Sequence, residues 1–344
     1  MRGSDMASNY PTLKDVSAEA GVSMALASVV LNGKKSRIKA SEATRKKILD
    51  AAKKFGYEPN RNARALRMSR SFLIGVITYD ISSSFIPKIL TGIEQGFMHT
   101  NYSVLPISYH NSEEFAEALE TLRKRKIDGL VMITTHFDGF PEELSMWNSV
   151  AKVFVGCTPQ LENTSSVRAD GFTVGKIAAE AFLKRGCRKF IHITHSVYCG
   201  NRSGWKETLK RAGIPGKDMI FFNTSLELEK SHKAVKALLL QEPDADCVFA
   251  DSDITAAAVL KAAKEIGRKV PDDLQVIGTD DSMICQITAP PLSSIWQPKI
   301  QQGEAAAKLM LTLLNENKTG ALVLPVHLEE RESIKPLINE GDKQ

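Results

Sequence analysis

The chain has 344 residues, of which 43% are hydrophobic, and it carries 45 Lys and Arg against 40 Asp and Glu. These values are typical of a globular protein with two or three domains and a substantial core. No apolar run approaches the ~20 residues of a membrane helix, and the N-terminal residues lack the apolar stretch of a signal peptide. We therefore expect a cytoplasmic protein without a membrane partner.

Charge is distributed unevenly along the chain. Residues 1–70 hold 15 Lys and Arg against 6 Asp and Glu, a net charge of +9, whereas the other 274 residues hold 30 against 34, a net charge of −4. A basic segment on a mildly acidic body indicates phosphate binding confined to one end of the molecule. Residues 1–8 (MRGSDMAS) look like the remnant of an expression tag and are left out of the fold prediction.

The first part of this basic segment has the pattern of a helix-turn-helix motif. Apolar residues four apart mark a helix over residues 12–20, Gly21 supplies the turn, and Ser23 is suited to cap a second helix that reaches Asn32. In this motif the second helix enters the major groove of DNA. Double-stranded DNA is therefore the first partner that the sequence predicts.

A third helix should complete a small all-α headpiece. Ser41 is suited to begin it, Gly56 to end it, and one side carries an apolar stripe formed by Ile48, Ala51, Ala52 and Phe55. Three helices of this kind can bury a common core, so we expect a DNA-binding headpiece over residues 9–59. Residues 60–71, which follow Pro59, should form a hinge or linker.

From residue 72 onward, strand-like apolar runs alternate with amphipathic helical segments. The clearest runs are 73–78, 103–108, 129–133, 153–155, 190–194, 247–250 and 275–278. This alternation predicts parallel sheets with crossover helices, and ~270 residues are more than one such sheet usually holds. We expect two lobes with a ligand cleft between them, because ligands of doubly wound sheets bind beyond the carboxyl ends of the strands.

Five segments resemble, in the same order, the lac repressor family of bacterial transcription regulators: TLKDVSAEAGVS, YEPNRNARAL, LIGVIT, VPDDLQVIGTDDS and PPLSSIWQP. The resemblance extends from Tyr10 to about Leu337. It implies an all-α helix-turn-helix headpiece joined to an α/β core of two doubly wound parallel-sheet lobes, similar to periplasmic binding proteins. It also implies a dimer or tetramer that binds a pseudo-palindromic operator and senses a small effector.

The resemblance also implies how the core is divided. The core should span residues 72–338, with an N-lobe of residues 72–168 and 299–324 and a C-lobe of residues 169–297 and 325–338. No heptad repeat follows it, which favours a homodimer over a tetramer. The function expected from the family is repression of a carbohydrate-utilisation operon, controlled by a sugar or sugar derivative.

The second helix of the headpiece is expected to read the operator. Relatives commonly have a basic base-reading side chain where this chain has Val29, so readout rests on small and apolar side chains that can contact thymine methyl groups. Packing, not DNA contact, is expected for Leu26 and Val30. The DNA-binding residues predicted in the headpiece are Thr12, Ser23, Met24, Ala25, Ser28, Val29 and Asn32.

Residues 60–68 match the hinge helix of the family, in which a leucine wedges between base steps in the minor groove. Leu66 has that place, and Arg67 beside it is suited to the narrowed minor groove. So short a helix is unstable alone, and it should become ordered only on DNA. The alternative is a basic linker that touches phosphates without folding. The contacts predicted here are Asn60, Arg61, Ala63, Leu66 and Arg67.

Side chains at or near strand ends are the candidate effector contacts. The carboxylates of Asp170 and Asp280 can accept hydrogen bonds from polyol hydroxyls, and Phe85 and Trp296 offer ring faces. The resemblance places ligand contacts at these positions too. The full predicted set is Ser84, Phe85, Asp170, His195, Asn201, Arg202, Ser252, Asp253, Asp280 and Trp296. Asp281 is expected to cap a helix instead.

One departure from the family leaves the charge of the effector open. Relatives often have Arg-x-x-Gly-Phe where this chain has Asn201-Arg202-Ser203-Gly204-Trp205. If Asn201 occupies the site, a neutral ligand fits better than one with a carboxylate. If Arg202 reaches the site, this preference reverses. Trp205 is expected to pack inside the lobe.

Other kinds of chemistry find little support in the sequence. His192, His195 and Cys199 lack a fourth ligand, so we expect no metal. Residues 33–36 (GKKS) lack the glycine and strand of a phosphate loop, and no GxGxxG or GxSxG motif occurs, so we expect neither a cofactor nor an enzyme. The alternatives are a solute-binding receptor with the same core and, more distantly, a sugar-processing enzyme. The five cysteines should be reduced.

Overall fold

The structure is a computed structural model, and it describes residues 11–31, 40–58, 70–81, 83, 85–134, 144, 147, 149–156, 164–194, 200–225 and 227–337. The chain divides into two compact units, Met1–Ser71 and Phe72–Gln344, and each is described here by itself. Within the described ranges, no helix is long and apolar enough to cross a membrane.

The first unit contains the helices α1 (Leu13–Glu19), α2 (Met24–Leu31) and α3 (Glu42–Phe55). Each helix starts beside a hydroxyl group that accepts a hydrogen bond from a backbone N–H of its first turn, and these caps are Thr12, Ser23 and Ser41. Gly21 and Gly56 follow α1 and α3 with φ values of +64° and +62°, a conformation that glycine adopts without strain. The predicted helix-turn-helix motif is therefore present.

A small apolar core holds the three helices together. Its buried side chains are Val16, Ala27, Val30, Ile48, Ala51 and Ala52. The prediction that Phe55 belongs to the apolar side of α3 is wrong, because its side chain is 37% exposed. The chain turns back at Gly56, so that the Tyr57 amide bonds to the Ala52 carbonyl and the Tyr57 side chain packs against the core in place of Phe55.

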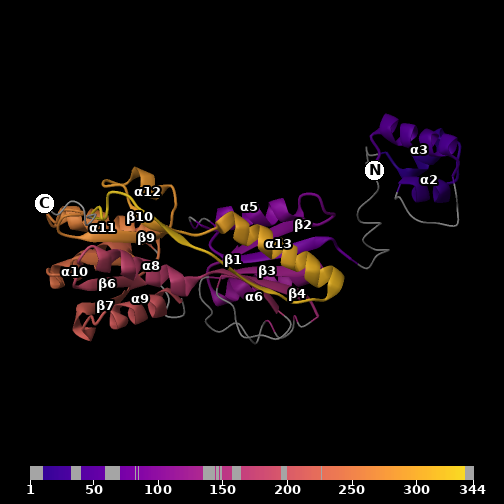
Figure 1. Cartoon of the computed structure of the whole chain (residues 1–344). Coiled ribbons are helices and arrows are strands. Elements are labelled where there is room, and N and C mark those ends of the chain that lie inside the picture. The colour runs from indigo at the N-terminus through magenta and orange to yellow at the C-terminus, as the bar shows by residue number, and fades with distance from the viewer. Residues whose placement is uncertain are drawn as a thin grey trace, which may run out of the picture. The chain divides into compact units, whose positions relative to one another are not determined.

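The second unit contains two separate sheets, and Figure 1 labels most of their strands. The N-lobe sheet has the order β11-β5-β4-β3-β1-β2 with all neighbours parallel. Its strands are β1 (Leu73–Tyr79), β2 (Ser103–Tyr109), β3 (Gly129–Thr134), β4 (Ala151–Gly156), β5 (Thr164–Ala169) and β11 (Ala321–Leu324). Its helices are α5 (Ile86–Phe97), α6 (Ser112–Lys124) and α13 (Lys299–Glu316).

The C-lobe sheet has the order β12-β10-β9-β8-β6-β7, and only β12 is antiparallel to its neighbour. Its strands are β6 (Phe190–Thr194), β7 (Met219–Asn223), β8 (Cys247–Ala250), β9 (Gln275–Asp280), β10 (Ser293–Trp296) and β12 (His327–Glu329). Its helices are α8 (Gly171–Lys184), α9 (Gly200–Arg211), the 3₁₀ turn η1 (Gly216–Asp218), α10 (Leu228–Gln241), α11 (Asp253–Glu265) and α12 (Ile284–Ile287).

Each sheet is covered by helices on both faces. In the C-lobe, Ile191 and Val248 pack with side chains of α10 and α11, whereas Phe190 and Phe249 on the opposite face pack with α8 and α9. In the N-lobe, α5 and α13 cover one face and α6 the other. Strands buried on both faces read as continuous apolar runs, which is how the sequence showed them. The predicted fold of two doubly wound lobes is confirmed.

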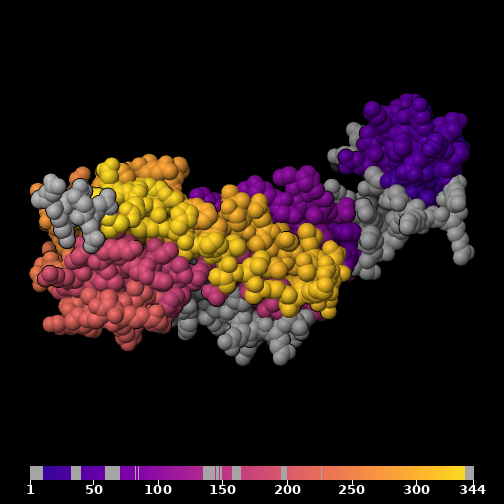
Figure 2. Space-filling model, in the orientation of Figure 1, coloured from indigo at the N-terminus to yellow at the C-terminus, as the bar shows by residue number. Residues whose placement is uncertain are grey.

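The chain passes between the two lobes three times, after β5, after β10 and after β11. On the face shown in Figure 2, the segments beyond residue 299 accordingly cover part of both lobes. In each sheet the strand order reverses once, between β1 and β3 in the N-lobe and between β6 and β8 in the C-lobe. Such reversals, at the carboxyl ends of the strands, are where doubly wound sheets bind ligands.

Candidate functional site

A buried polar cluster lies at the reversal of the C-lobe sheet. Asp251 follows β8, and its Oδ1 accepts hydrogen bonds from the Asn201 amide at 3.0 Å and from His192 Nε2 at 3.0 Å. The fully buried His192 ring stacks on Phe249, with 4.9 Å between ring centroids. Burial alone would raise the pKa of Asp251, but the hydrogen bonds and the histidine charge lower it overall. Asp251 is therefore an ionised acceptor.

Asp280, the last residue of β9, is joined by an ion pair to the N-lobe helix α13. Lys299 Nζ lies 2.7 Å from Asp280 Oδ1, and the two side chains are only 9% and 10% exposed. Burial raises the pKa of Asp280 and the charge of Asp251 adds to the rise, whereas Lys299 opposes it. The site thus combines two carboxylates and one ammonium where the two lobes meet.

Two aromatic side chains of the predicted effector set lie beside this ion pair. Phe85 precedes α5, and Lys299 Nζ lies 5.0 Å from the centroid of its ring. Trp296 pairs in register with Asp280 across β9 and β10, and it stacks on His327 with 4.7 Å between centroids. Both rings are half-buried. They are therefore placed to cover the faces of a small ligand.

Two further predicted contacts cap helices. Asp170 accepts hydrogen bonds from the Thr173 amide at 3.1 Å and the Thr173 hydroxyl at 2.7 Å at the start of α8. Burial raises the pKa of Asp170, but these bonds outweigh it and the pKa is lowered. Ser252 accepts from the Thr255 amide at 3.2 Å at the start of α11. Both caps are half-buried at carboxyl ends of strands.

The structure places Asn201 and Arg202 in different surroundings. Asn201 is 9% exposed and belongs to the Asp251 cluster. The guanidinium of Arg202 lies 4.4 Å from the centroid of the Phe221 ring on the edge strand β7. Of the two alternatives, only Asn201 therefore joins the polar cluster. Trp205 is fully buried, so its predicted packing role is confirmed.

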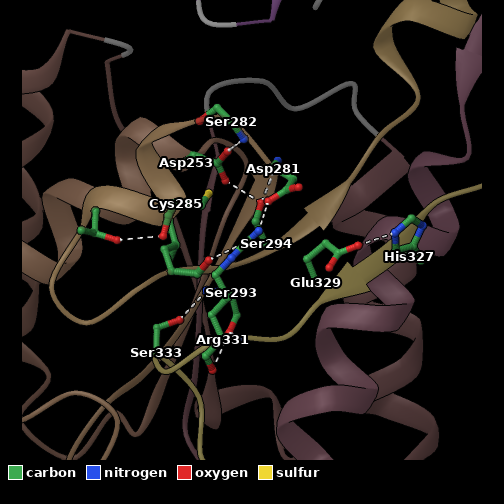
Figure 3. A network of polar contacts seen from close by, with 12 residues as sticks. Asp253, Asp281, Ser282, Cys285, Ser293, Ser294, His327, Glu329, Arg331 and Ser333 are labelled. Atoms are coloured by element: carbon green, nitrogen blue, oxygen red, sulfur yellow. Dashed lines mark hydrogen bonds and ion pairs between the residues drawn. The ribbon is translucent and has the colours of Figure 1, made fainter.

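Asp253 lies deeper than the sequence suggested. It is 2% exposed, and its two oxygens accept hydrogen bonds from the Ser282 amide at 2.7 Å and the Ser294 hydroxyl at 2.6 Å, as Figure 3 shows. These bonds use both oxygens inside the C-lobe. The predicted direct contact between Asp253 and the effector is therefore corrected: the residue positions the loop that follows β9.

The prediction that Asp281 caps a helix is wrong. Its amide donates to the Ser294 hydroxyl at 3.0 Å, and its carboxylate accepts from Arg331 Nη2 at 2.7 Å (Figure 3). The next helix, α12, begins three residues later and has no side-chain cap. Asp281 instead ties the loop after β9 to the C-terminal segment that returns from the N-lobe.

Burial and the nearby charge of Asp280 raise the pKa of Asp253 from 3.8 to about 6. A carboxyl whose pKa is higher in the folded state contributes stability below about pH 4 that is lost as the pH rises through about 6. Asp253→Asn cannot ionise; its carbonyl oxygen can still accept from the Ser282 amide, and its NH2 group can donate to the Ser294 hydroxyl oxygen in place of the bond that Asp253 accepts. In this variant the free energy of unfolding should no longer fall between about pH 4 and pH 6. At pH 7 the variant should be more stable than the parent by on the order of 2 kcal/mol. Thermal unfolding between pH 4 and 8 measures the slope, and an unchanged slope would contradict the assignment.

The headpiece exposes one side of α2. Met24 is 54% exposed and Ala25 is exposed, while Ala27 and Val30 on the other side are buried. Leu26 packs against the headpiece core. This arrangement agrees with packing for Leu26 and Val30. Several predicted contacts lie outside the described residues: Asn32, Asn60, Arg61, Ala63, Leu66, Arg67, Ser84 and His195.

Comparison with known proteins accounts for both units. The family of bacterial regulatory proteins, lacI family, matches residues 12–60, and the periplasmic binding protein-like domain matches residues 179–334. The ribose operon repressor of Bacillus subtilis (strain 168) is 33% identical over 325 residues, which make up 92% of this chain and 96% of the relative. The chain belongs to the lacI family. This lacI-family protein is a DNA-binding transcription regulator with an effector-binding core, as the sequence predicted.

Solved structures of relatives share its fold. The lacI-family regulator from Enterococcus faecium with bound ribose is 26% identical, with a TM-score of 0.68, and the match covers 77% of this chain and 100% of that chain. The lac repressor dimer bound to operator is 23% identical, with a TM-score of 0.83, and the match covers 94% and 99%. The second likeness concerns the fold alone.

Two site residues escaped the sequence analysis of this lacI-family regulator, Asp251 and Lys299. Asp251 directly follows the apolar run 247–250, which is the same strand-end signal that pointed to Asp170 and Asp280. No local signal marks Lys299, because its partner belongs to another lobe.

Proposed function

We propose that this regulator is a repressor whose operator affinity is controlled by an uncharged pentose, with D-ribose as the first candidate. The observation that carries the proposal is the pair of carboxylates, Asp251 and Asp280, at the carboxyl ends of β8 and β9, with Asn201 and two rings beside them. Hydroxyl groups are good donors to such carboxylates. A relative that covers most of the chain is named for the ribose operon, and another was solved with ribose.

The remaining parts of the proposal concern DNA and assembly. Residues 9–59 would bind a pseudo-palindromic operator in the cytoplasm, residues 60–71 would form the hinge with Leu66 as the wedge, and residues 72–338 would bind effector and pair as a homodimer. Met283 and Ile287, beside and on α12, are each 77% exposed. Exposed apolar side chains of this size are suited to a subunit interface.

Two other functions have less support. A solute-binding receptor shares the core architecture, but the lacI-family match over residues 12–60 gives this chain a DNA-binding unit that such a receptor does not need. A sugar-processing enzyme is disfavoured because the relative that is 33% identical over most of this chain is a repressor. A turnover assay on pentoses distinguishes an enzyme from a binder.

Asp280→Ala is expected to lower the affinity for D-ribose at least tenfold, because it removes a charge-assisted hydrogen bond worth about 1.5 to 3 kcal/mol. Titration calorimetry measures the affinity, and fluorescence anisotropy measures operator binding with and without ribose. The variant should still bind operator but should no longer respond to ribose.

Asp272→Ala is the matched control, since Asp272 is an exposed carboxylate in the turn before β9. It should keep the parent affinity for ribose. Unchanged ribose affinity in folded Asp280→Ala would refute the proposed site. A parent protein that binds operator but neither binds nor responds to ribose would refute the proposed effector.

A further inference from the structure

We propose that Lys299 determines which charge the effector can carry. Its ammonium occupies the position beside Asp280 that a cationic ligand group would take. The site therefore selects an uncharged polyhydroxy ligand over a phosphorylated or an amino-substituted one. The inference rests on the proposed function, in which Asp280 contacts the effector. It goes beyond that function because it assigns a specificity-determining role to a residue of the N-lobe.

The first argument is that the Lys299 ammonium is already engaged. Its Nζ lies 2.7 Å from Asp280 Oδ1, donates to Gln297 Oε1 at 2.9 Å and faces the Phe85 ring at 5.0 Å. Two of its three N–H donors are used by Asp280 and Gln297, and the ammonium also faces the ring within the range of a cation–π contact. A phosphate or a carboxylate of a ligand would therefore have to compete with these contacts for the Lys299 ammonium.

The second argument concerns the charges that surround Asp280. Asp251 follows β8 and is ionised, and Asp253 begins α11 and is ionised above about pH 6; both interact with Asp280. On the positive side stand Lys299 and the more distant, exposed Lys88 of α5. An anionic ligand group would enter a place where carboxylates outnumber the buried cation, and it would be repelled.

The third argument is that acceptor capacity remains for hydroxyl groups. An ionised carboxylate has about four lone-pair directions, so one contact with Lys299 leaves others for ligand hydroxyls. A ligand ammonium would have to displace Lys299 from a pocket in which its side chain is only 9% exposed. Neutral hydroxyl groups need no such displacement. The ion pair thus favours a neutral polyol.

Lys299 also favours the ionised form of Asp280. Burial and Asp251 raise the pKa of Asp280, and Lys299 is the nearest group that opposes this rise. Without Lys299 the pKa of Asp280 must rise further, and the carboxyl would take up a proton nearer neutral pH. Since the ionised form is the stronger acceptor, ribose affinity should then fall with decreasing pH at a higher midpoint than in the parent protein.

Lys299→Met tests the proposal, because methionine keeps a long, flexible side chain and removes the charge. Lys308→Met on the exposed side of the same helix is the matched control. Titration calorimetry between pH 5.5 and 8.5, a range chosen to span the expected titration, uses D-ribose, D-ribose 5-phosphate and 3-amino-3-deoxy-D-ribose as probes. In the parent and in Lys308→Met, ribose should bind at least tenfold more tightly than either charged probe.

Lys299→Met should lose at least tenfold in ribose affinity at pH 7, prefer the amino sugar over ribose, and show the upward shift of the pH midpoint. Lys299→Arg should restore the parent midpoint. A structural role alone would lower the affinity for all probes equally and leave the midpoint in place.

The outcomes separate this inference from the function on which it rests. If ribose binds and Asp280→Ala abolishes binding, but Lys299→Met keeps the parent preference and pH midpoint, the role of Lys299 is refuted and the proposed function stands. If D-ribose 5-phosphate binds the parent more tightly than ribose, the proposal that the site selects an uncharged ligand is refuted. If none of the three probes binds the parent, both proposals fail.

Discussion

Gly303→Ala is expected to destabilise the core unit by roughly 3 kcal/mol, the upper part of the range for overpacking. Gly303 on α13 faces Gly92 on α5, and a Cβ atom added at Gly303 would lie 2.1 Å from the Ile89 carbonyl oxygen and 2.6 Å from the Ile93 nitrogen. These are backbone atoms, which cannot rotate away as a side chain can. The two helices would have to move apart along their contact.

The same change should weaken effector binding, because α13 begins with Lys299 and α5 follows Phe85. Separation of the helices moves the ammonium relative to Asp280 and the ring. Calorimetric unfolding and D-ribose titration of the full chain measure the two effects. Gly216→Ala is the control, since a Cβ there meets no atom within 4 Å. Equal stabilities of Gly303→Ala and the parent would show that the helices are not in close contact.

The sequence predicted the centre of each sheet and missed most of the edges. The runs 190–194 and 247–250 coincide with β6 and β8, because central parallel strands are apolar on both faces. β7, β11 and β12 are edge strands of three to five residues, and β10 is a neighbour of one edge with four. Short strands with exposed or polar residues carry no periodic pattern, so that only pairing with their neighbours defines them.

Residues of the candidate site could be predicted only where they lie at the end of an apolar strand. Asp280 ends β9, and the apolar run before it marks that end in the sequence. The prediction that Asp253 contacts the effector was wrong, because a position next to a strand end does not say whether the side chain points into the lobe or out of it. Lys299 could not be found at all, since its contact with Asp280 depends on the passage of the chain from one lobe to the other.

Ile48→Ala is expected to weaken operator binding and to leave effector binding intact. The Ile48 side chain is fully buried in the headpiece core, which has six buried apolar residues in the described part of this unit. Replacing a buried isoleucine with alanine costs about 2 to 5 kcal/mol. So small a core supplies only roughly 3 to 5 kcal/mol of net stability, so a loss of this size brings the headpiece close to the midpoint of unfolding.

Anisotropy with a labelled operator and calorimetric titration with D-ribose measure the two functions of the full chain. Operator affinity should fall by the factor by which the folded fraction of the headpiece falls, about tenfold where the loss exceeds the stability of the headpiece by about 1.4 kcal/mol, whereas ribose affinity should match that of the parent. Leu49→Ala is the control: its side chain, next along α3, is 46% exposed, and both affinities should stay at their parent values. Operator affinity that stays at the parent value in Ile48→Ala would mean that the headpiece core is more stable than its size predicts, or that the operator contacts lie elsewhere in the chain.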